Sequence, residues 1–151
     1  MNSHPLQSQS LLRQQRGIGL IEVLITVLVL AIGLLGLAGL QLASLRNNQS
    51  AMERSMGVMQ SYSIIEAIRA DADSAKNGRF NIGLEDDPSA STTFPAQSVQ
   101  VWRAQLTQNL GSAAKGSVAC NSTDCTVIVQ WDDSRGLGGS ATQQITTEVQ
   151  L

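Results

Sequence analysis

A long uncharged stretch constrains this chain more than any other feature. Residues 23–45 contain no charged side chain, and the polar residues among them are Thr26, Gln41 and Ser44. At about 1.5 Å of rise per residue, a helix of this length reaches roughly 35 Å, enough to cross the hydrocarbon core of a bilayer with some tilt. The sequence therefore predicts a membrane-spanning helix near the beginning of the chain.

The residues before this stretch form a polar leader, 1–17, that carries Arg13 and Arg16 near its end. An ordinary secretory signal places its small-residue cleavage site after the apolar region. Here the small residue Gly17 precedes the apolar region, so cleavage after it removes the arginines and leaves the apolar helix on the mature protein. Because positive charge stays on the cytoplasmic side, the arginines predict a single pass with a cytoplasmic N-terminus and a periplasmic C-terminal domain.

Glu22 lies at the mouth of the apolar stretch, where a charged group is costly. It is one helical turn beyond Ile18, so its carboxylate is close to the amine that cleavage creates and to the positive end of the helix dipole. The alternative is a glutamate that reaches the membrane interface and has no partner.

The stretch 17–22 combines a glycine, an apolar first mature residue and a glutamate at the fifth mature position, and it resembles the type IV prepilin signature. The resemblance implies that a prepilin peptidase cleaves between Gly17 and Ile18 and methylates the new amine of Ile18. It also implies that Glu22 sets the register of a filament by pairing with the amine of a neighbouring subunit, since an unpaired buried charge is heavily penalised. Ile18 departs from the phenylalanine of most major pilins, which favours a minor pilin.

No proline or charge cluster ends the helix after Leu45, and we expect one helix from Ile18 to about Ala75, roughly 85 Å long, with Gly78 as its stop signal. Its apolar residues beyond the membrane fall on two sides, which predicts two environments. The first stripe, expected to face neighbouring subunits, comprises Leu45, Met52, Met56 and Met59; the second, expected to face the chain's own domain, comprises Val58, Tyr62, Ile65, Ile68 and Ala72. The alternative is that the methionines are exposed and the change of side is accidental.

The C-terminal part reads as an irregular connection at 77–95, a helix at 95–110 and three strands at 117–120, 125–131 and 143–151. A competing interpretation makes 99–102 a strand. An antiparallel sheet packed on the long helix gives an α+β fold similar to that of type IV pilins. The expected organisation is a leader at 1–17, an apolar transmembrane or filament-core helix at 18–45, the periplasmic half of that helix at 46–76, and a small globular domain at 77–151.

Cys120 and Cys125 flank a short turn, and we expect them to form a structural disulfide in an oxidising compartment. We expect no metal site and no cofactor, because His4 is the sole histidine and lies in the leader. The acidic runs at 85–87 and 132–133 are either calcium ligands or, as we expect, solvated loop charge; the surrounding segment 132–140 is expected to be flexible. A mature chain without histidine is not expected to be an enzyme, and a net charge of −2 argues against nucleic acid as a partner.

The stretch 125–133 resembles the sheet of PilV-type minor pilins, and the expected function is therefore that of a minor pilin that supports pilus assembly or priming, with a place at the pilus tip. The implied partners are the prepilin peptidase, other minor and major pilins, and the inner-membrane assembly platform. A minor pseudopilin of a type II secretion system is the nearest alternative. A major pilin and a plain membrane anchor with a ligand-binding periplasmic domain are the remaining ones.

Overall fold

The computed structural model describes residues 19–151, which divide into two units that meet between Leu40 and Gln41. The elements in chain order are α1 (Leu20–Ala70), α2 (Ala72–Lys76), α3 (Phe94–Leu110), β1 (Lys115–Cys120), β2 (Asp124–Trp131) and β3 (Gln143–Gln150). Helix α1 runs through the boundary between the two units. The leader 1–17 and Ile18 lie outside the described residues.

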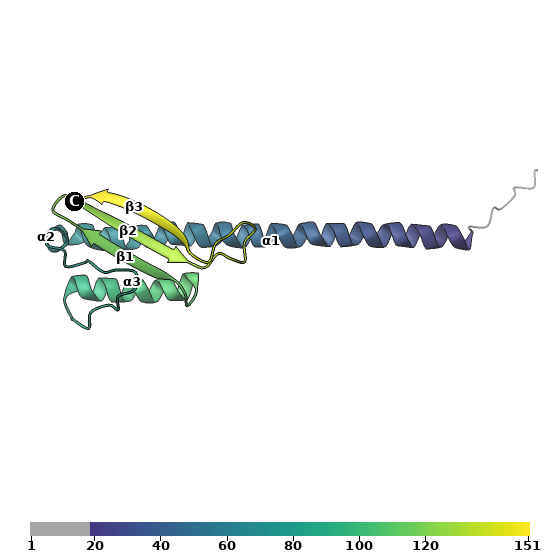
Figure 1. The fold of residues 1–151 in the computed structure, drawn as a ribbon. Coiled ribbons are helices and arrows are strands. Elements are labelled where there is room, and N and C mark those ends of the chain that lie inside the picture. Colours follow the sequence, from purple (N-terminus) through teal and green to yellow (C-terminus); the bar gives the residue numbers. More distant parts are fainter. Residues whose placement is uncertain (1–18) are drawn as a thin grey trace, which may run out of the picture. The chain divides into compact units, whose positions relative to one another are not determined.

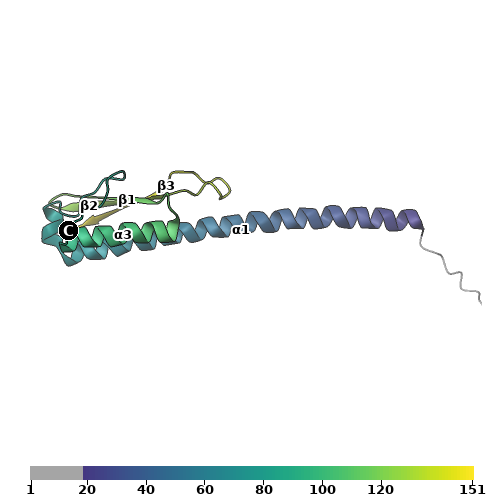
Figure 2. The same ribbon diagram turned by 90° about the horizontal axis from the view of Figure 1, so that it is seen from below.

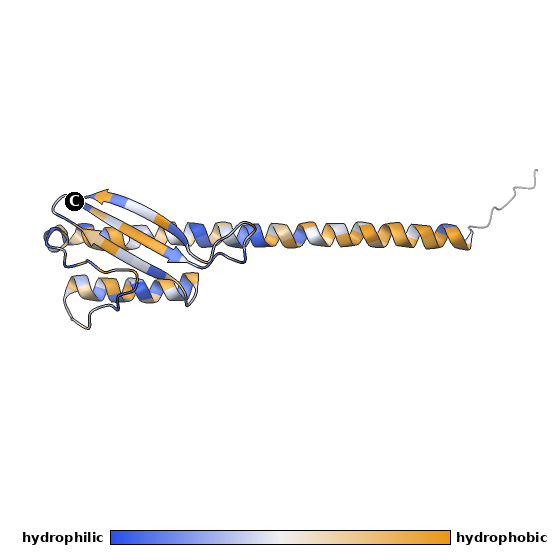
Figure 3. Ribbon diagram, in the orientation of Figure 1, coloured by the Kyte–Doolittle hydropathy of each residue, from blue (hydrophilic) through white to orange (hydrophobic). Residues whose placement is uncertain are grey.

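The part of α1 before Gln41 is predominantly apolar, as the prevalence of orange along it in Figure 3 shows. All of its side chains are exposed within the chain. By length and composition this helix can cross a membrane. A helix that is hydrophobic all round belongs in an apolar environment rather than on the surface of a soluble domain.

The unit from Gln41 onward has two layers, shown from two directions in Figures 1 and 2. The later part of α1 and helix α3 lie side by side in one layer, and a three-stranded sheet forms the other. The strands are antiparallel in the order β1-β2-β3. This α+β arrangement, a long N-terminal helix on a small antiparallel sheet, is consistent with the type IV pilin fold and confirms the expected fold class.

Helix α3 begins and ends where its sequence signals predict. Pro95 lies in the first turn, where a missing N–H group costs nothing. Gly111 follows the last turn with φ of 98°, a conformation that glycine adopts without strain. Its buried stripe consists of Pro95, Val99, Trp102, Leu106 and Leu110. The helix predicted at 95–110 is therefore confirmed, and the competing strand at 99–102 is wrong.

Strand β2 lies at the centre of the sheet and has the clearest alternation. Cys125, Val127, Val129 and Trp131 are buried on the face toward the helices, whereas the residues between them are half-buried. The register pairs Cys120 with Cys125 across β1 and β2, and Val129 with Ile145 across β2 and β3. All three predicted strands are present, and β1 begins two residues earlier than expected, at Lys115.

The contact between α3 and β1 depends on a residue without a side chain. Gly116 is buried, and a Cβ atom there would lie 2.4 Å from Trp102 Cη2 and 2.6 Å from Leu106 Cδ1. Trp102 in turn donates a hydrogen bond from Nε1 to the carbonyl oxygen of Gln60 on α1, at 2.9 Å. The indole of Trp102 therefore joins both helices and the sheet in one core.

Helix α1 ends at Ala70, earlier than the predicted end near Ala75. Asp71 leaves the helical conformation, with φ of −136° and ψ of 63°, and its carboxylate accepts a hydrogen bond of 3.2 Å from the N–H group of Ser74. Aspartate favours this cap position over a helix interior, because its side chain competes for backbone N–H groups. The five residues of α2 are therefore a separate helix.

The later part of α1 faces the domain with one continuous stripe, so the predicted change of side is wrong. Val58 and Tyr62, predicted to face the domain, are 41% and 56% exposed, and Met56, predicted to face neighbouring subunits, packs against the core. The predictions for Ile65 and Ile68 are confirmed. The stripe consists of Ser50, Glu53, Met56, Gly57, Gln60, Ser61, Ile64, Ile65, Ala67 and Ile68. Half of these residues are polar or glycine, which hides the stripe from a search for apolar periodicity.

The connection between α2 and α3 covers the outer edge of β1. Ile82 and Val118 exchange two backbone hydrogen bonds of 2.9 and 3.0 Å. Beside them, the Asn81 carboxamide accepts from the N–H group of Cys120 at 2.7 Å and donates to its carbonyl oxygen at 3.2 Å. One edge of the sheet is thus satisfied by the chain's own connection.

Candidate functional site

Glu22 lies in the first turn of α1, the position at which a carboxylate is favoured by the helix dipole. Its backbone N–H group donates to the carbonyl oxygen of Gly19 at 2.9 Å, and its own carbonyl oxygen accepts from the hydroxyl of Thr26 at 2.6 Å. The side chain is exposed, and within the described part of the chain its carboxylate makes no hydrogen bond or ion pair. The residue is therefore held by the helix backbone, with its charge directed outward.

Gly17 and Ile18, the predicted cleavage and methylation positions, lie outside the described residues, as do Arg13 and Arg16. The structure describes the residues that follow the predicted cleavage position. Helix α1 begins at Leu20, so the described chain enters an apolar helix directly.

The tip of the hairpin between β1 and β2 is closed by the predicted disulfide between Cys120 and Cys125, whose α-carbons lie 4.0 Å apart. The turn is also ordered by Asn121, whose side-chain oxygen accepts hydrogen bonds from the N–H groups of Thr123 and Asp124 at 2.8 and 2.7 Å. Cys125 is fully buried. Cys120 is half-buried, and the bonded pair fits a structural staple rather than a reactive thiol site.

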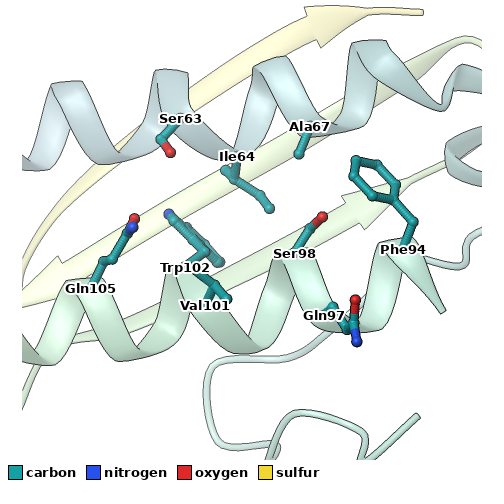
Figure 4. A pocket seen from close by; sticks show the side chains of 9 residues that line it. All are labelled: Ser63, Ile64, Ala67, Phe94, Gln97, Ser98, Val101, Trp102 and Gln105. Carbon is teal, nitrogen blue, oxygen red and sulfur yellow. The ribbon is translucent and has the colours of Figure 1, made fainter. Parts of the chain in front are cut away.

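A shallow groove of about 320 Å³ lies between α1 and α3. Figure 4 shows Ile64 and Trp102 at its base, with Phe94 at one end. Ser63, Gln97, Ser98 and Gln105 supply polar groups along the rim, and no charged side chain lines it. The groove lacks the convergent titratable groups that an active site requires.

The most unexpected polar contact involves Asp133, which the sequence analysis treated as solvated loop charge. That expectation is wrong for Asp133, because the residue is 1% exposed and accepts a hydrogen bond from the Ser50 hydroxyl at 2.7 Å. The segment 132–140, expected to be flexible, forms backbone hydrogen bonds around Asp133, and its flexibility stays a prediction. The available signal was the glycine-rich sequence that follows, Gly136 to Gly139, which allows backbone to close around a side chain.

Comparison with protein families gives one match. The family model described as the prokaryotic N-terminal methylation motif matches residues 12–38. This range contains Gly17, Ile18 and Glu22 and ends within the apolar part of α1. No curated protein and no solved structure matches the chain.

The matched motif and the helix that follows it define a class of protein. Residues 12–38 carry a type IV prepilin-like leader, which indicates a precursor of the pilin or pseudopilin type that is processed by a prepilin peptidase. The leader implies pilin-type partners, and the apolar helix together with the motif indicates anchoring in a membrane. The match covers the N-terminal region only, and the remainder of the class assignment rests on the fold.

Proposed function

We propose that the chain is a minor pilin of the PilV type, inserted in the inner membrane with its N-terminus in the cytoplasm and then incorporated into a type IV pilus, at its tip. The observation that carries this proposal is the continuity of three features. The methylation motif at 12–38 leads directly into an exposed apolar helix, and that helix carries a small disulfide-bonded sheet. Pilins need these three parts for processing, packing and display.

The proposed mechanism is packing and register, without a catalytic step, a cofactor or a metal. Before cleavage, Arg13 and Arg16 hold the leader in the cytoplasm and the apolar helix lies in the bilayer. After cleavage at Gly17, the same helix packs among those of other subunits. The exposed Glu22 carboxylate then pairs with the methylated amine of a neighbouring subunit, and the cost of an unpaired charge selects one register.

N-terminal sequencing of the mature protein tests the processing step. We expect the mature chain to begin at methylated Ile18 in cells that contain the peptidase and at Met1 in cells that lack it. A bulky residue at Gly17 blocks cleavage, whereas Gly17→Ala retains part of it, because the peptide must fit closely at the scissile bond. A mature chain that begins at Met1 in peptidase-containing cells contradicts the proposal and favours a plain membrane anchor.

Replacement of Glu22 tests the register step separately. We expect Glu22→Val to leave cleavage intact and to reduce the amount of the protein in sheared pili by at least tenfold, whereas Glu22→Asp retains part of the incorporation. Leu24→Val, on the same apolar helix, serves as the matched control and is incorporated normally. Normal incorporation of Glu22→Val contradicts a role in register.

A minor pseudopilin of a type II secretion system is the second candidate, since it shares the leader and the helix. The two functions predict different locations for the processed protein. A minor pilin is recovered in sheared filaments and lost from them when the inner-membrane assembly platform of the pilus is deleted. A pseudopilin stays in the cell envelope, and its deletion stops secretion of folded proteins instead.

A further inference from the structure

The segment that joins β2 to β3, residues 132–140, is held on α1 by one buried carboxylate. Asp133 Oδ2 accepts a hydrogen bond from the Ser50 hydroxyl at 2.7 Å, and a guanidinium nitrogen of Arg54 lies 3.5 Å from the same oxygen. Only 1% of Asp133 is exposed. Because a buried charge is costly unless it is paired and hydrogen-bonded, the carboxylate ties this segment, here called the strap, to one position on the helix.

Hydrogen bonds within the strap itself order its backbone around Asp133, independently of its contacts with α1. The N–H group of Asp133 donates to the carbonyl oxygen of Ser140 at 2.9 Å, and the N–H group of Gly136 donates to the carbonyl oxygen of Asp133 at 3.0 Å. A Cβ atom at Gly139 would lie 1.8 Å from that carbonyl oxygen, so only glycine fits there. The backbone thus presents the carboxylate to the helix.

A second, weaker contact lies beside the first. A guanidinium nitrogen of Arg135 is 3.5 Å from Glu53 Oε1, and the Arg135 side chain is largely exposed. The Glu53 side chain is 14% exposed, but its partner lies in solvent at a long separation, and such a pair contributes about 1 kcal/mol or less. The strap is therefore attached mainly through Asp133.

The contacts of α1 change in kind along its length. In the described part of α1 before Ser50, every side-chain hydrogen bond stays within the helix itself. Residues 50–54 contact the strap through polar groups, and the apolar core begins with Met56. Gly57 follows, and the sheet approaches it closely. A Cβ atom added there would lie 3.1 Å from Ile145 Cδ1 and 3.2 Å from Trp131 Cζ3.

No residue of the strap belongs to the buried apolar cluster or packs against it. The strap consists of polar contacts and glycine-containing backbone, while the sheet and α3 are held by apolar burial. Segments with few buried apolar contacts open locally at a lower free energy than the core. The strap can therefore open while the sheet stays folded.

We propose that opening and closing of the strap determine at which residue the domain begins to contact and stabilise, or support, helix α1. With the strap closed, support begins at Ser50; with the strap open, it begins at Met56. Opening adds six residues, 50–55, to the unsupported helix, a length of about 9 Å. This inference concerns the domain alone, and it holds whether the chain enters a pilus or a secretion system.

Amide hydrogen exchange on the full-length protein in detergent micelles tests the proposal. We expect Ser50→Ala and Asp133→Asn to speed exchange in peptides from 46–56 and 132–140 by roughly tenfold or more, since each removes the charge-assisted hydrogen bond that closes the strap. Exchange in β1, β2 and α3 stays unchanged. Asp132→Asn is the matched control, because it makes the same substitution one residue earlier, where the carboxylate accepts from Ser134 within the strap and has no hydrogen bond or ion pair to α1. We expect it to leave exchange in 46–56 unchanged.

A covalent lock tests the opposite direction. A Cβ atom at Gly136 would lie 3.0 Å from Ser50 Cβ, slightly closer than the 3.5–4.5 Å typical of disulfides, and Gly136 has no positive φ. We expect Ser50→Cys with Gly136→Cys, once oxidised, to slow exchange in 46–56 below that of the unmodified protein. The two single cysteine variants are the controls.

Two results overturn the proposal. The first is exchange in 46–56 that neither rises in Ser50→Ala nor falls in the oxidised double-cysteine variant, which shows that the strap does not determine support of the helix. The second is faster exchange throughout β1 and β2 in Ser50→Ala, which shows that the strap is part of the core and opens only with it.

Discussion

The stretch of α1 up to Leu40 and the stretch from Gln41 onward have the same helical backbone conformation and differ in what surrounds them. Before Gln41, apolar side chains cover every side of the helix, and all are exposed within the chain. From Ser50 onward, one side is buried against the domain, and the exposed sides carry charged and polar groups together with single apolar residues such as Met52 and Met59. A helix that is apolar all round needs an apolar partner on every side, whereas an amphipathic one needs a single covering layer.

The two stretches are therefore stabilised by different means. The first needs an apolar environment from outside the chain, so we expect substitutions there to leave the domain intact. The second depends on the chain's own core, so substitutions there change the free energy of unfolding. Each prediction below places a change in one stretch or its packing partners, and most add a matched change elsewhere in the chain.

The largest effect is expected at the residue that joins both helices and the sheet. Trp102→Ala lowers the free energy of unfolding by about 3–5 kcal/mol, because it leaves a cavity and removes the hydrogen bond to Gln60. Leu34→Ala, at a side chain that is 57% exposed, leaves this free energy unchanged. Urea titration of the full-length protein in micelles, followed by the fluorescence of Trp131, measures both. Equal losses in the two variants contradict the separation of the stretches.

A smaller loss is expected where α3 meets β1. Gly116→Ala lowers the free energy of unfolding by about 2 kcal/mol, since a methyl group there overlaps Trp102 and Leu106 and forces them to move. Gly111 has open space around it but a positive φ, so Gly111→Ala separates backbone strain from overpacking. The same urea titration applies. A Gly116→Ala variant as stable as the unmodified protein shows that the core is looser than its geometry indicates.

Two glycines of α1 give the sharpest comparison of the stretches. Gly36 has nothing within 4 Å of an added Cβ atom, so Gly36→Ala stabilises the helix by about 1 kcal/mol through its propensity. Gly57→Ala makes the same gain but places a methyl group 3.1–3.2 Å from Ile145 and Trp131. We expect a net loss of about 1 kcal/mol there. Hydrogen exchange of the neighbouring amides measures each change. We expect slower exchange in Gly36→Ala and faster exchange in Gly57→Ala; a change in the same direction in both variants contradicts the difference between the two stretches.

The smallest effect is expected at Asp132, the half-buried neighbour of the buried Asp133. Hydrogen bonds from the side chain and backbone of Ser134 lower the pKa of the Asp132 carboxyl. A carboxyl with a lowered pKa in the folded state stabilises that state above its unfolded pKa and loses the contribution as the pH falls through the folded pKa. Asp132→Asn therefore changes the unfolding midpoint slightly at pH 7 and not at all near pH 2. A lower unfolding midpoint of Asp132→Asn that persists at pH 2 shows that the side chain contributes through something other than its charge.

Apolar periodicity predicts the parts of the fold whose packing is apolar. The spacing of Val99, Trp102, Leu106 and Leu110 predicts α3, and the alternation from Cys125 to Trp131 predicts β2, because these residues are the buried ones. The domain-facing side of α1 is different. It begins with Ser50 and Glu53 and includes Gly57, Gln60 and Ser61, so part of its burial comes from close approach and hydrogen bonds as well as from apolar side chains.

The functional motif and the buried contact of Asp133 also differ in how far the sequence alone predicts them. The motif around Gly17, Ile18 and Glu22 is local, and reading it requires only the order of residues along the chain. The contact between Ser50 and Asp133 joins residues separated by 83 positions, and neither residue type indicates burial by itself. Such a pairing depends on the register of the sheet over the helix, which only the folded chain determines.

The Cys120–Cys125 bond closes the hairpin between β1 and β2, next to the connection that covers the edge of β1. Disulfides form and persist where thiols are oxidised and are rare in a reducing cytosol. The bond is therefore expected only in chains that have reached an oxidising compartment. The mass difference between the dithiol and the disulfide measures what share of the molecules has done so.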